Sequence, residues 1–125
     1  MRLLLDTHVA IWLARDADEL TPAARRLIQD ADAVFLSSAS LWEVTIKVAL
    51  GKLPLVPQRF ADQLLAAGVE QLAVNWGHAL AVHQLPMLHK DPFDRLLVAQ
   101  AMSEPMHLLT HDSLLTAYSP LVIVH

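Results

Sequence analysis

Short, uninterrupted apolar runs recur along the chain and alternate with longer stretches in which apolar residues return at helical spacing. Five such runs predict strands: 2–5 (RLLL), 33–38 (AVFLSS), 69–74 (VEQLAV), 106–110 (MHLLT) and 121–125 (LVIVH). Because these runs are continuous rather than alternating, they are typical of strands that are buried on both faces. The pattern therefore predicts an α/β fold, in which helices cover both faces of a mainly parallel sheet of short strands.

The stretches between the runs carry helix signals at their ends. We expect helices over residues 7–14, 21–31, 39–53, 59–68, 76–85, 92–104 and 111–118, with loops over 54–58 and 86–91. Thr21 is placed to cap a helix whose first residue is Pro22. Gly51 and Gly68 are placed to end two others. With no internal repeat and no long linker, residues 1–125 are interpreted as a single domain.

Composition narrows the classes of protein that fit. Of the 125 residues, 54% are apolar, and this excess predicts a thick core, an oligomer or partner surface, or both. No apolar run approaches the roughly 20 residues that a membrane span needs. The first residues, MRLLLDTH, are too short an apolar segment for a signal peptide. The chain has no cysteine and hence no disulfide or thiolate chemistry, and a cytoplasmic protein is expected.

The net charge of −4 argues against a protein that holds nucleic acid by bulk electrostatics, because such binding is driven by release of counterions from phosphates. Action on nucleic acid would require a local site or the help of a cation.

Four acids fall at or near the ends of predicted strands. Asp6 closes the first strand, Glu43 lies in the first turns of the helix after the second, and Asp112 follows the strand 106–110 by two residues. Asp94 lies in the first turn of the helix that feeds this same strand. We expect that helix to begin at the opposite edge of the sheet, so that the loop before it must place Asp94 near the other acids. Ligands of open parallel sheets bind outside the carboxyl ends of the strands, which makes the four acids candidate site residues.

Each acid also has a purely local explanation. Asp6 is placed to cap the helix that begins near Thr7, and Asp112 to cap the segment 113–118. Ser40 and Glu43 have the spacing of a capping box, and Glu43 could instead pair with Lys47 one turn along.

Two acids open the helix in HKDPFDR. Asp91 before Pro92 is placed as the cap, which puts Asp94 at the third helical position, where a negative charge suits the helix dipole.

Four acids at one kind of location favour a shared site. Clustered carboxylates raise one another's pKa unless a cation is present, and oxygen ligands without cysteine or histidine suit Mg²⁺ or Mn²⁺. Such ions activate water and stabilise charge in phosphodiester cleavage. The residues therefore predict an acidic metal site that hydrolyses phosphodiesters.

Four segments of the chain also resemble a known family. LLLDTHVAIWL, SSASLWEVTIKVALGKL, HKDPFDRLLVAQA and LLTHD occur in the order and spacing typical of PIN-domain ribonucleases, above all the VapC-like toxins of bacterial toxin–antitoxin pairs. The resemblance covers nearly the whole chain. It implies a three-layer α/β/α PIN fold with about five strands, Mg²⁺- or Mn²⁺-dependent endoribonuclease activity on RNA, a cognate antitoxin protein and a homodimer.

The resemblance also assigns residues. The four acids of the family correspond to Asp6, Glu43, Asp94 and Asp112, which it implies are catalytic and metal-binding. Thr7 and Thr110 match supporting polar positions, and Asp91 belongs to a subgroup pattern whose role the resemblance leaves open.

Other polar and aromatic residues have simpler expectations. His89, Lys90 and Arg95 lie near the proposed site, where they could contact phosphate. Solvated charges are the favoured expectation for His89 and Lys90, and Arg95 could equally pair with Asp91. The spacing of His107 and His111 does not predict a zinc pair. The three tryptophans, Trp12, Trp42 and Trp76, lie on apolar helices and are expected in the core or at an interface rather than against bases.

Two other functions stay open alongside the ribonuclease. A receiver-like phosphoacceptor domain would need paired acids after the first strand and an aspartate ending a central strand, but Asp6 stands alone and FLSS ends without an acid. A catalytically inactive PIN-like binding module would have no need of the four acids.

Overall fold

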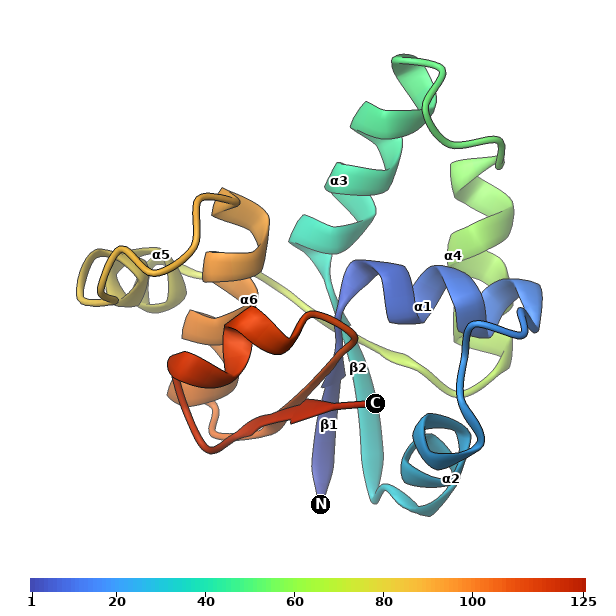
Figure 1. Ribbon diagram of the computed structural model, residues 1–125. Helices are drawn as coiled ribbons and strands as arrows, with labels where there is room; N and C mark the ends of the chain where they lie inside the picture. Colours follow the sequence, from blue (N-terminus) through green and yellow to red (C-terminus); the bar gives the residue numbers. More distant parts are fainter.

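A five-stranded parallel sheet forms the centre of the computed structural model, which describes residues 1–125 (Figure 1). The strands are β1 (Arg2–Leu5), β2 (Ala33–Ser37), β3 (Glu70–Leu72), β4 (His107–Thr110) and β5 (Val122–Val124). Their order across the sheet is β3-β2-β1-β4-β5, and every neighbouring pair is parallel. All five predicted strands are confirmed, and their carboxyl ends share one edge.

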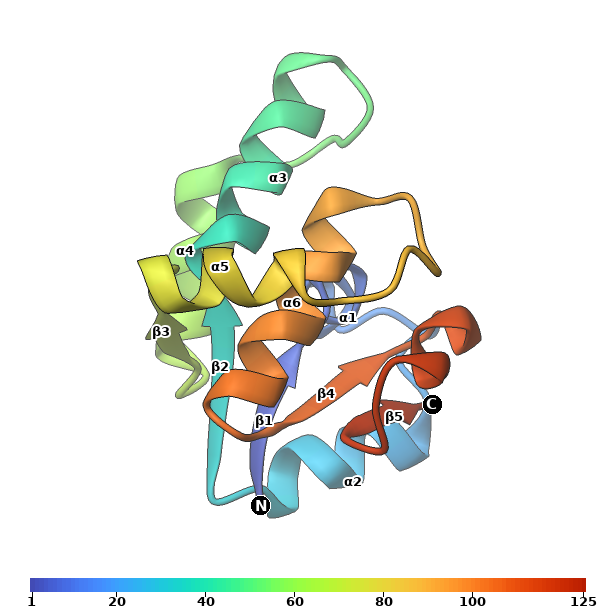
Figure 2. The same cartoon turned by 90° about the vertical axis from the view of Figure 1, so that its left-hand side faces the viewer.

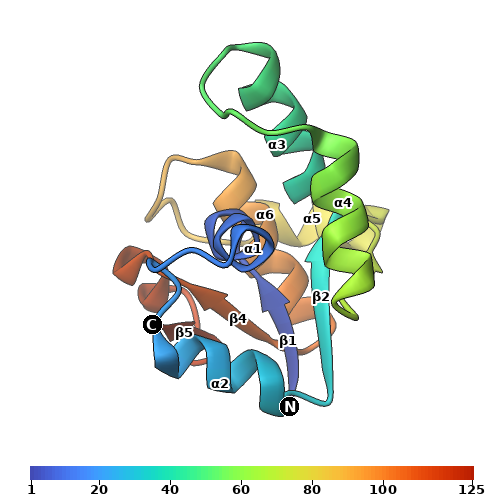
Figure 3. The same cartoon turned by 90° about the vertical axis from the view of Figure 1, so that its right-hand side faces the viewer.

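Six α-helices and one 3₁₀ helix connect the strands. They are α1 (Thr7–Arg15), α2 (Pro22–Asp30), α3 (Ser38–Ala49), α4 (Pro57–Ala66), α5 (Trp76–His83), α6 (Pro92–Ser103) and η1 (Ser113–Ala117). In Figures 2 and 3, α1, α2 and α4 lie on one face of the sheet, and α5 and α6 lie on the other. The three-layer α/β/α arrangement is confirmed. None of the helices is long and apolar enough to cross a membrane.

The pleat of β1 divides the core between the two faces. Leu3 and Leu5 pack with the helices on one side of the sheet, and Leu4 packs with α6 on the other; all three are fully buried. Successive side chains of a strand point to opposite faces, so residues 3–5 are apolar throughout because both faces are covered.

Local signals set most of the helix ends. The Thr21 hydroxyl accepts a hydrogen bond from the Ala24 N–H, and Pro22 is the first residue of α2. Gly51 and Gly68 adopt φ values of +71° and +89°, which explains glycine beyond the ends of α3 and α4. Several predicted boundaries are wrong: α3 spans Ser38–Ala49 with Ser37 as its cap rather than 39–53, and α4 begins at Pro57 inside a predicted loop. The helix predicted over 111–118 is the 3₁₀ helix Ser113–Ala117.

The helical hairpin of α3 and α4 projects beyond the carboxyl edge of the sheet (Figure 1). Several of its large apolar side chains and those of its connection are exposed: Trp42, Leu50, Val56 and Leu65. The projection therefore carries unpartnered apolar surface close to the edge at which the acids lie.

Candidate active site

A hollow of about 440 Å³ opens at the carboxyl edge of the sheet and gathers all four predicted acids. Its lining consists of five carboxylates and three aromatic rings: Asp6, Glu43, Asp91, Asp94 and Asp112 with His8, Trp12 and His111. These residues come from α1, α3, α6 and the segments around them, so the site is assembled from parts of the chain far apart in sequence.

The position of α6 explains how Asp94 reaches this edge. The helix runs down from the carboxyl edge and leads into β4, which is parallel to β1, so its first turn lies where the strands end (Figure 2). The expectation that this helix begins at the opposite edge is therefore wrong, because a helix that returns the chain to the start of a parallel strand must run antiparallel to it.

The two acids that open α6 occupy different environments. The Asp91 side chain caps the helix, since its Oδ1 accepts from the Phe93 N–H at 2.8 Å and from the Asp94 N–H at 3.4 Å. Asp94 is the third helical residue, as predicted, and its carboxylate lies 3.7 Å from the ring of His89.

Asp6 is buried at the end of β1 and held from the neighbouring strand. Thr110, the last residue of β4, donates a hydrogen bond of 2.5 Å to Asp6 Oδ2. Asp6 is the residue before α1, but its side chain makes no capping hydrogen bond, so the local explanation for this acid is wrong. Burial raises the pKa of Asp6, while the Thr110 hydroxyl and the nearby His8 oppose that rise.

Glu43 is also buried, and its two oxygens have different partners. Oε1 accepts from the Thr7 hydroxyl at 2.7 Å, and Oε2 lies 2.9 Å from the Lys47 ammonium. The pairing with Lys47 is confirmed, whereas the capping box is wrong: α3 begins at Ser38, and the Ser40 hydroxyl lies 3.0 Å from Thr7. Thr7 and Lys47 together fix the orientation of the Glu43 carboxylate.

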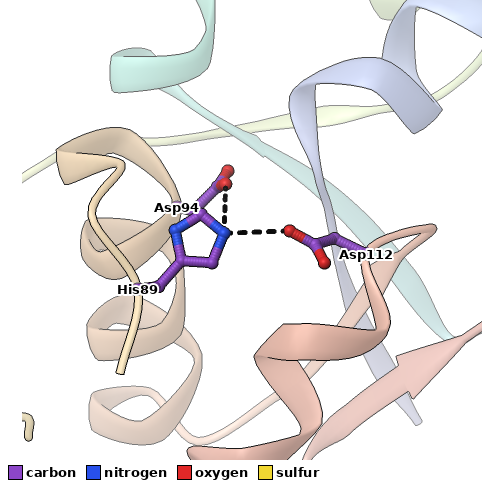
Figure 4. A group of neighbouring side chains, drawn as sticks. All are labelled: His89, Asp94 and Asp112. Atoms are coloured by element: carbon purple, nitrogen blue, oxygen red, sulfur yellow. Dashed lines mark hydrogen bonds and ion pairs between the residues drawn. The ribbon is translucent and has the colours of Figure 1, made fainter. Parts of the chain in front are cut away.

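Asp112 links the acids to a residue that the sequence did not assign to the site. Its Oδ1 accepts from the Leu114 N–H at 3.0 Å and caps η1, as expected. Its Oδ2 accepts from His89 Nε2, also at 3.0 Å (Figure 4).

His89 lies between Asp94 and Asp112 rather than in solvent, and only 15% of its side chain is exposed (Figure 4). The expectation of a solvated charge is wrong, because the backbone N–H groups of Leu88 and His89 donate to the Tyr118 hydroxyl and hold the loop where the ring meets the two acids. The Asp91 N–H donates to His89 Nδ1 at 3.1 Å, so Nδ1 is an acceptor and the ring proton sits on Nε2, facing the two carboxylates. The backbone thereby makes His89 a hydrogen-bond donor to the site.

Asp94 carries the largest electrostatic cost. Its pKa is raised to about 7 by burial and by the carboxylates of Asp6 and Asp91, with His89 acting in the opposite direction. Unlike Glu43, Asp94 has no ammonium beside it, and unlike Asp6 it accepts no side-chain hydrogen bond. The hollow therefore holds more negative charge than its own residues neutralise.

The donor set fits a divalent cation. Ligand atoms of His89, Asp94 and Asp112 lie within 4.8 Å of one another, and Asp6 and Glu43 line the same hollow. His89 presents a proton rather than a lone pair to Asp94 and Asp112, and the five carboxylates that line the hollow supply oxygen donors, which Mg²⁺ and Mn²⁺ prefer.

Arg95 is not brought to the site. Its guanidinium donates to the carbonyls of Val82 at 3.4 Å and Leu85 at 3.2 Å, and it lines a separate hollow beside α5. The expected ion pair with Asp91 does not form, because neighbouring residues of a helix point in different directions and the guanidinium lies against the end of α5. Lys90 is exposed, as expected.

The tryptophans divide between the site and the surface. Trp12 is half-buried and lines the hollow, whereas Trp42 and Trp76 are exposed and lie outside the core.

Comparisons with known proteins identify the family to which this fold belongs. A family model described as the PIN domain matches residues 3–119, and the chain therefore belongs to the PIN domain family. It is 30% identical over 118 residues to ribonuclease VapC22 of Mycobacterium tuberculosis (strain ATCC 25618 / H37Rv). The aligned region covers 93% of this chain and 91% of that protein.

Solved structures share the fold at lower identity. VapBC2 of Rickettsia felis, bound to a DNA fragment from its promoter, matches with a TM-score of 0.74 and 18% identity over 100% of this chain and 98% of that one. DNA-bound VapBC of Salmonella typhimurium matches with a TM-score of 0.69 and 17% identity over 100% and 97%. Membership of the PIN family excludes the receiver-like phosphoacceptor considered from the sequence.

Proposed function

We propose that this protein is a VapC-type endoribonuclease that hydrolyses RNA phosphodiesters with Mg²⁺ or Mn²⁺ and acts as the toxin of a toxin–antitoxin pair. The observation that carries the proposal is the uncompensated charge in the hollow: five carboxylates line it, and the pKa of Asp94 is raised to about 7. Perturbed acids gathered in a cleft are typical of functional sites, because folding alone gains nothing from their repulsion.

Asp6, Glu43, Asp94 and Asp112 are the residues that would hold the cation. When bound, a divalent cation lowers the pKa of water and stabilises the charge that develops on the phosphodiester. The chain supplies the positioning: Thr110 holds Asp6, Thr7 and Lys47 hold Glu43, and His89 holds Asp112. Each carboxylate except Asp94 is thus oriented by a named hydrogen bond or ion pair.

A cognate antitoxin is the proposed protein partner, since the structural relatives include VapBC complexes. The exposed apolar side chains of the α3–α4 hairpin are a surface that such a protein or a second copy of the chain could bury. We also propose a homodimer, and a location in the cytoplasm, where RNA would be within reach of the site.

The test is cleavage of RNA by purified, antitoxin-free protein. We expect cleavage in Mn²⁺ or Mg²⁺, loss of cleavage in excess EDTA, and recovery when the cation is restored. Asp94→Asn should be inactive, whereas the matched control Asp18→Asn, at an exposed carboxylate between α1 and α2, should cleave like the wild type. Cleavage that persists in EDTA would refute the metal site, and folded protein inactive with every cation would favour the inactive binding module.

A further inference from the structure

Aromatic side chains line the hollow together with the carboxylates. Every lining residue that is not an acid carries an aromatic ring: His8 and Trp12 on α1, and His111 between β4 and η1. The rings of Trp12 and His111 lie 5.3 Å apart at an interplanar angle of 78°, and those of His8 and Trp12 lie 6.2 Å apart at 49°. We call these three residues the aromatic wall.

Core packing explains only part of this wall. Trp12 packs partly against the core beneath α1, but His8 and His111 are exposed and contribute nothing to that core. His111 is nevertheless held in place, since its Nδ1 donates to the backbone oxygen of His125 at 3.2 Å. The wall therefore places two exposed rings and one half-buried ring beside the carboxylates.

We propose that the aromatic wall is a nucleobase-binding subsite, in which the base of a nucleotide stacks on Trp12 while its phosphate lies at the carboxylates. The inference rests on the proposed function and adds the part of RNA that the acids cannot recognise. Without a cation the carboxylates repel phosphate, whereas a flat base is neutral and gains from stacking on indole or imidazole.

The shape and chemistry of the wall support a base rather than another group. The volume of about 440 Å³ lies within the range of small-ligand pockets. The contact between Trp12 and His111 is T-shaped, with the edge of one ring against the face of the other, so a base would stack on a ring face that this contact leaves free. No amide side chain lines the hollow to read a base edge, and stacking accepts every base, so the subsite is expected to tolerate all four.

The experiment follows the fluorescence of Trp12 in the full chain. The chain has three tryptophans, so a variant with Trp42→Phe and Trp76→Phe leaves Trp12 as the only one. It is titrated in Mg²⁺ with adenosine 5′-monophosphate and, separately, with ribose 5-phosphate, which has the same phosphate and no base. We expect the nucleotide to quench Trp12 saturably and to bind roughly 5- to 150-fold more tightly than ribose 5-phosphate.

Two substitutions separate stacking from folding. In calorimetric titrations of otherwise wild-type protein, Trp12→Leu should remove the preference for the nucleotide, and Trp12→Phe, which keeps a ring, should retain part of it. Trp76→Leu is the matched control, because Trp76 is 89% exposed and lies outside the hollow. Thermal melts of each variant confirm that it is folded.

The outcomes distinguish the subsite from the ribonuclease itself. If both ligands bind equally well without quenching Trp12 while the protein still cleaves RNA, the subsite is refuted and the proposed function stands. If neither ligand binds and RNA is not cleaved, both are refuted. If Trp12→Leu keeps the nucleotide preference but loses binding to a protein antitoxin, the wall is a protein contact and the proposal is wrong.

Discussion

Replacing Asp94 with asparagine removes one charge from the most crowded part of the site at nearly constant shape. The carboxylate accepts no hydrogen bond from the protein and its nearest ring nitrogen, His89 Nε2, is 3.7 Å away, so the substitution breaks little. We therefore expect Asp94→Asn to stabilise the metal-free protein while it abolishes cleavage of RNA.

The size and pH dependence of this gain follow from the pKa of Asp94. The difference between the ordinary value of 3.8 and about 7 corresponds to about 4 kcal/mol of free energy of unfolding, because each pKa unit is worth about 1.36 kcal/mol. A raised carboxyl pKa means that the folded state binds more protons than the unfolded state between these two values. Stability is therefore lost as the pH rises from about 4 to about 7, and the loss is complete above that range.

Urea unfolding of wild type and Asp94→Asn in EDTA, at pH 5 and pH 8, measures this difference. We expect the variant to gain about 4 kcal/mol at pH 8 but only about 1.5 kcal/mol at pH 5, where most of the wild-type carboxyl is protonated in the folded state. Asp18→Asn, the exposed control, should show no such pH-dependent gain. Adding Mn²⁺ should stabilise the wild type and not the variant, because a ligand stabilises only the state that binds it.

A gain that is equal at the two pH values would refute the electrostatic reasoning, because the charge of the folded-state carboxyl is mostly removed by protonation at pH 5 and mostly present at pH 8. A variant that is less stable than wild type at pH 8 would show that the Asp94 carboxylate makes a favourable interaction in the metal-free protein. An active Asp94→Asn enzyme would remove Asp94 from the catalytic site.

Four further substitutions, at three residues, test the remaining assignments. Asp91→Ala should lower the free energy of unfolding by about 1 kcal/mol in urea titrations through loss of the helix cap, yet keep most of the RNA cleavage; a stable but inactive protein would contradict this. His89→Ala should lower kcat by releasing Asp112, whereas His89→Gln, whose amide N–H can still donate, should restore much of it; equal losses in the two variants would exclude the hydrogen-bonding role. Arg95→Met should cost about 1 kcal/mol in thermal or urea unfolding and leave cleavage unchanged, and a large loss of activity would place its guanidinium in the site after all.

The fold could be predicted because its signals are local. Runs such as RLLL are strands because both faces of the sheet are covered, and Thr21–Pro22 and Asp91–Pro92 mark helix starts by their own stereochemistry. The missed start of α4 at Pro57 carried the same signal, since proline is favoured in the first turn. The start of α3 is less visible, because its first turn continues the polar end of β2 without a break.

The sequence predicted the site residues that lie just after the ends of strands, but not those placed by loops or by contacts between helices. Asp6, Glu43 and Asp112 follow strands whose carboxyl ends share an edge, so their meeting required only the correct sheet. His89 lies beside Asp94 and Asp112 because of the conformation of the loop before α6, and that conformation could not be predicted from the sequence. Arg95 stands beside Asp94 in sequence, yet its direction depends on the carbonyls at the end of α5, a contact between two helices.

The two carboxylates at the head of α6 show how structure separates a local role from a functional one. Asp91 is accounted for by the helix itself: it bonds two free N–H groups of the first turn, and many polar residues would do the same. Asp94 gains at most a modest interaction with the helix dipole, while burial and two neighbouring acids disfavour its charge by several times that amount. With a pKa of about 7, the folded chain alone leaves this carboxyl partly protonated near neutral pH, and a bound cation would favour its charged form. A bound cation is the agent that the donor set around Asp94 fits, and the response of its stability to Mn²⁺ is therefore the most direct measure of what this residue does.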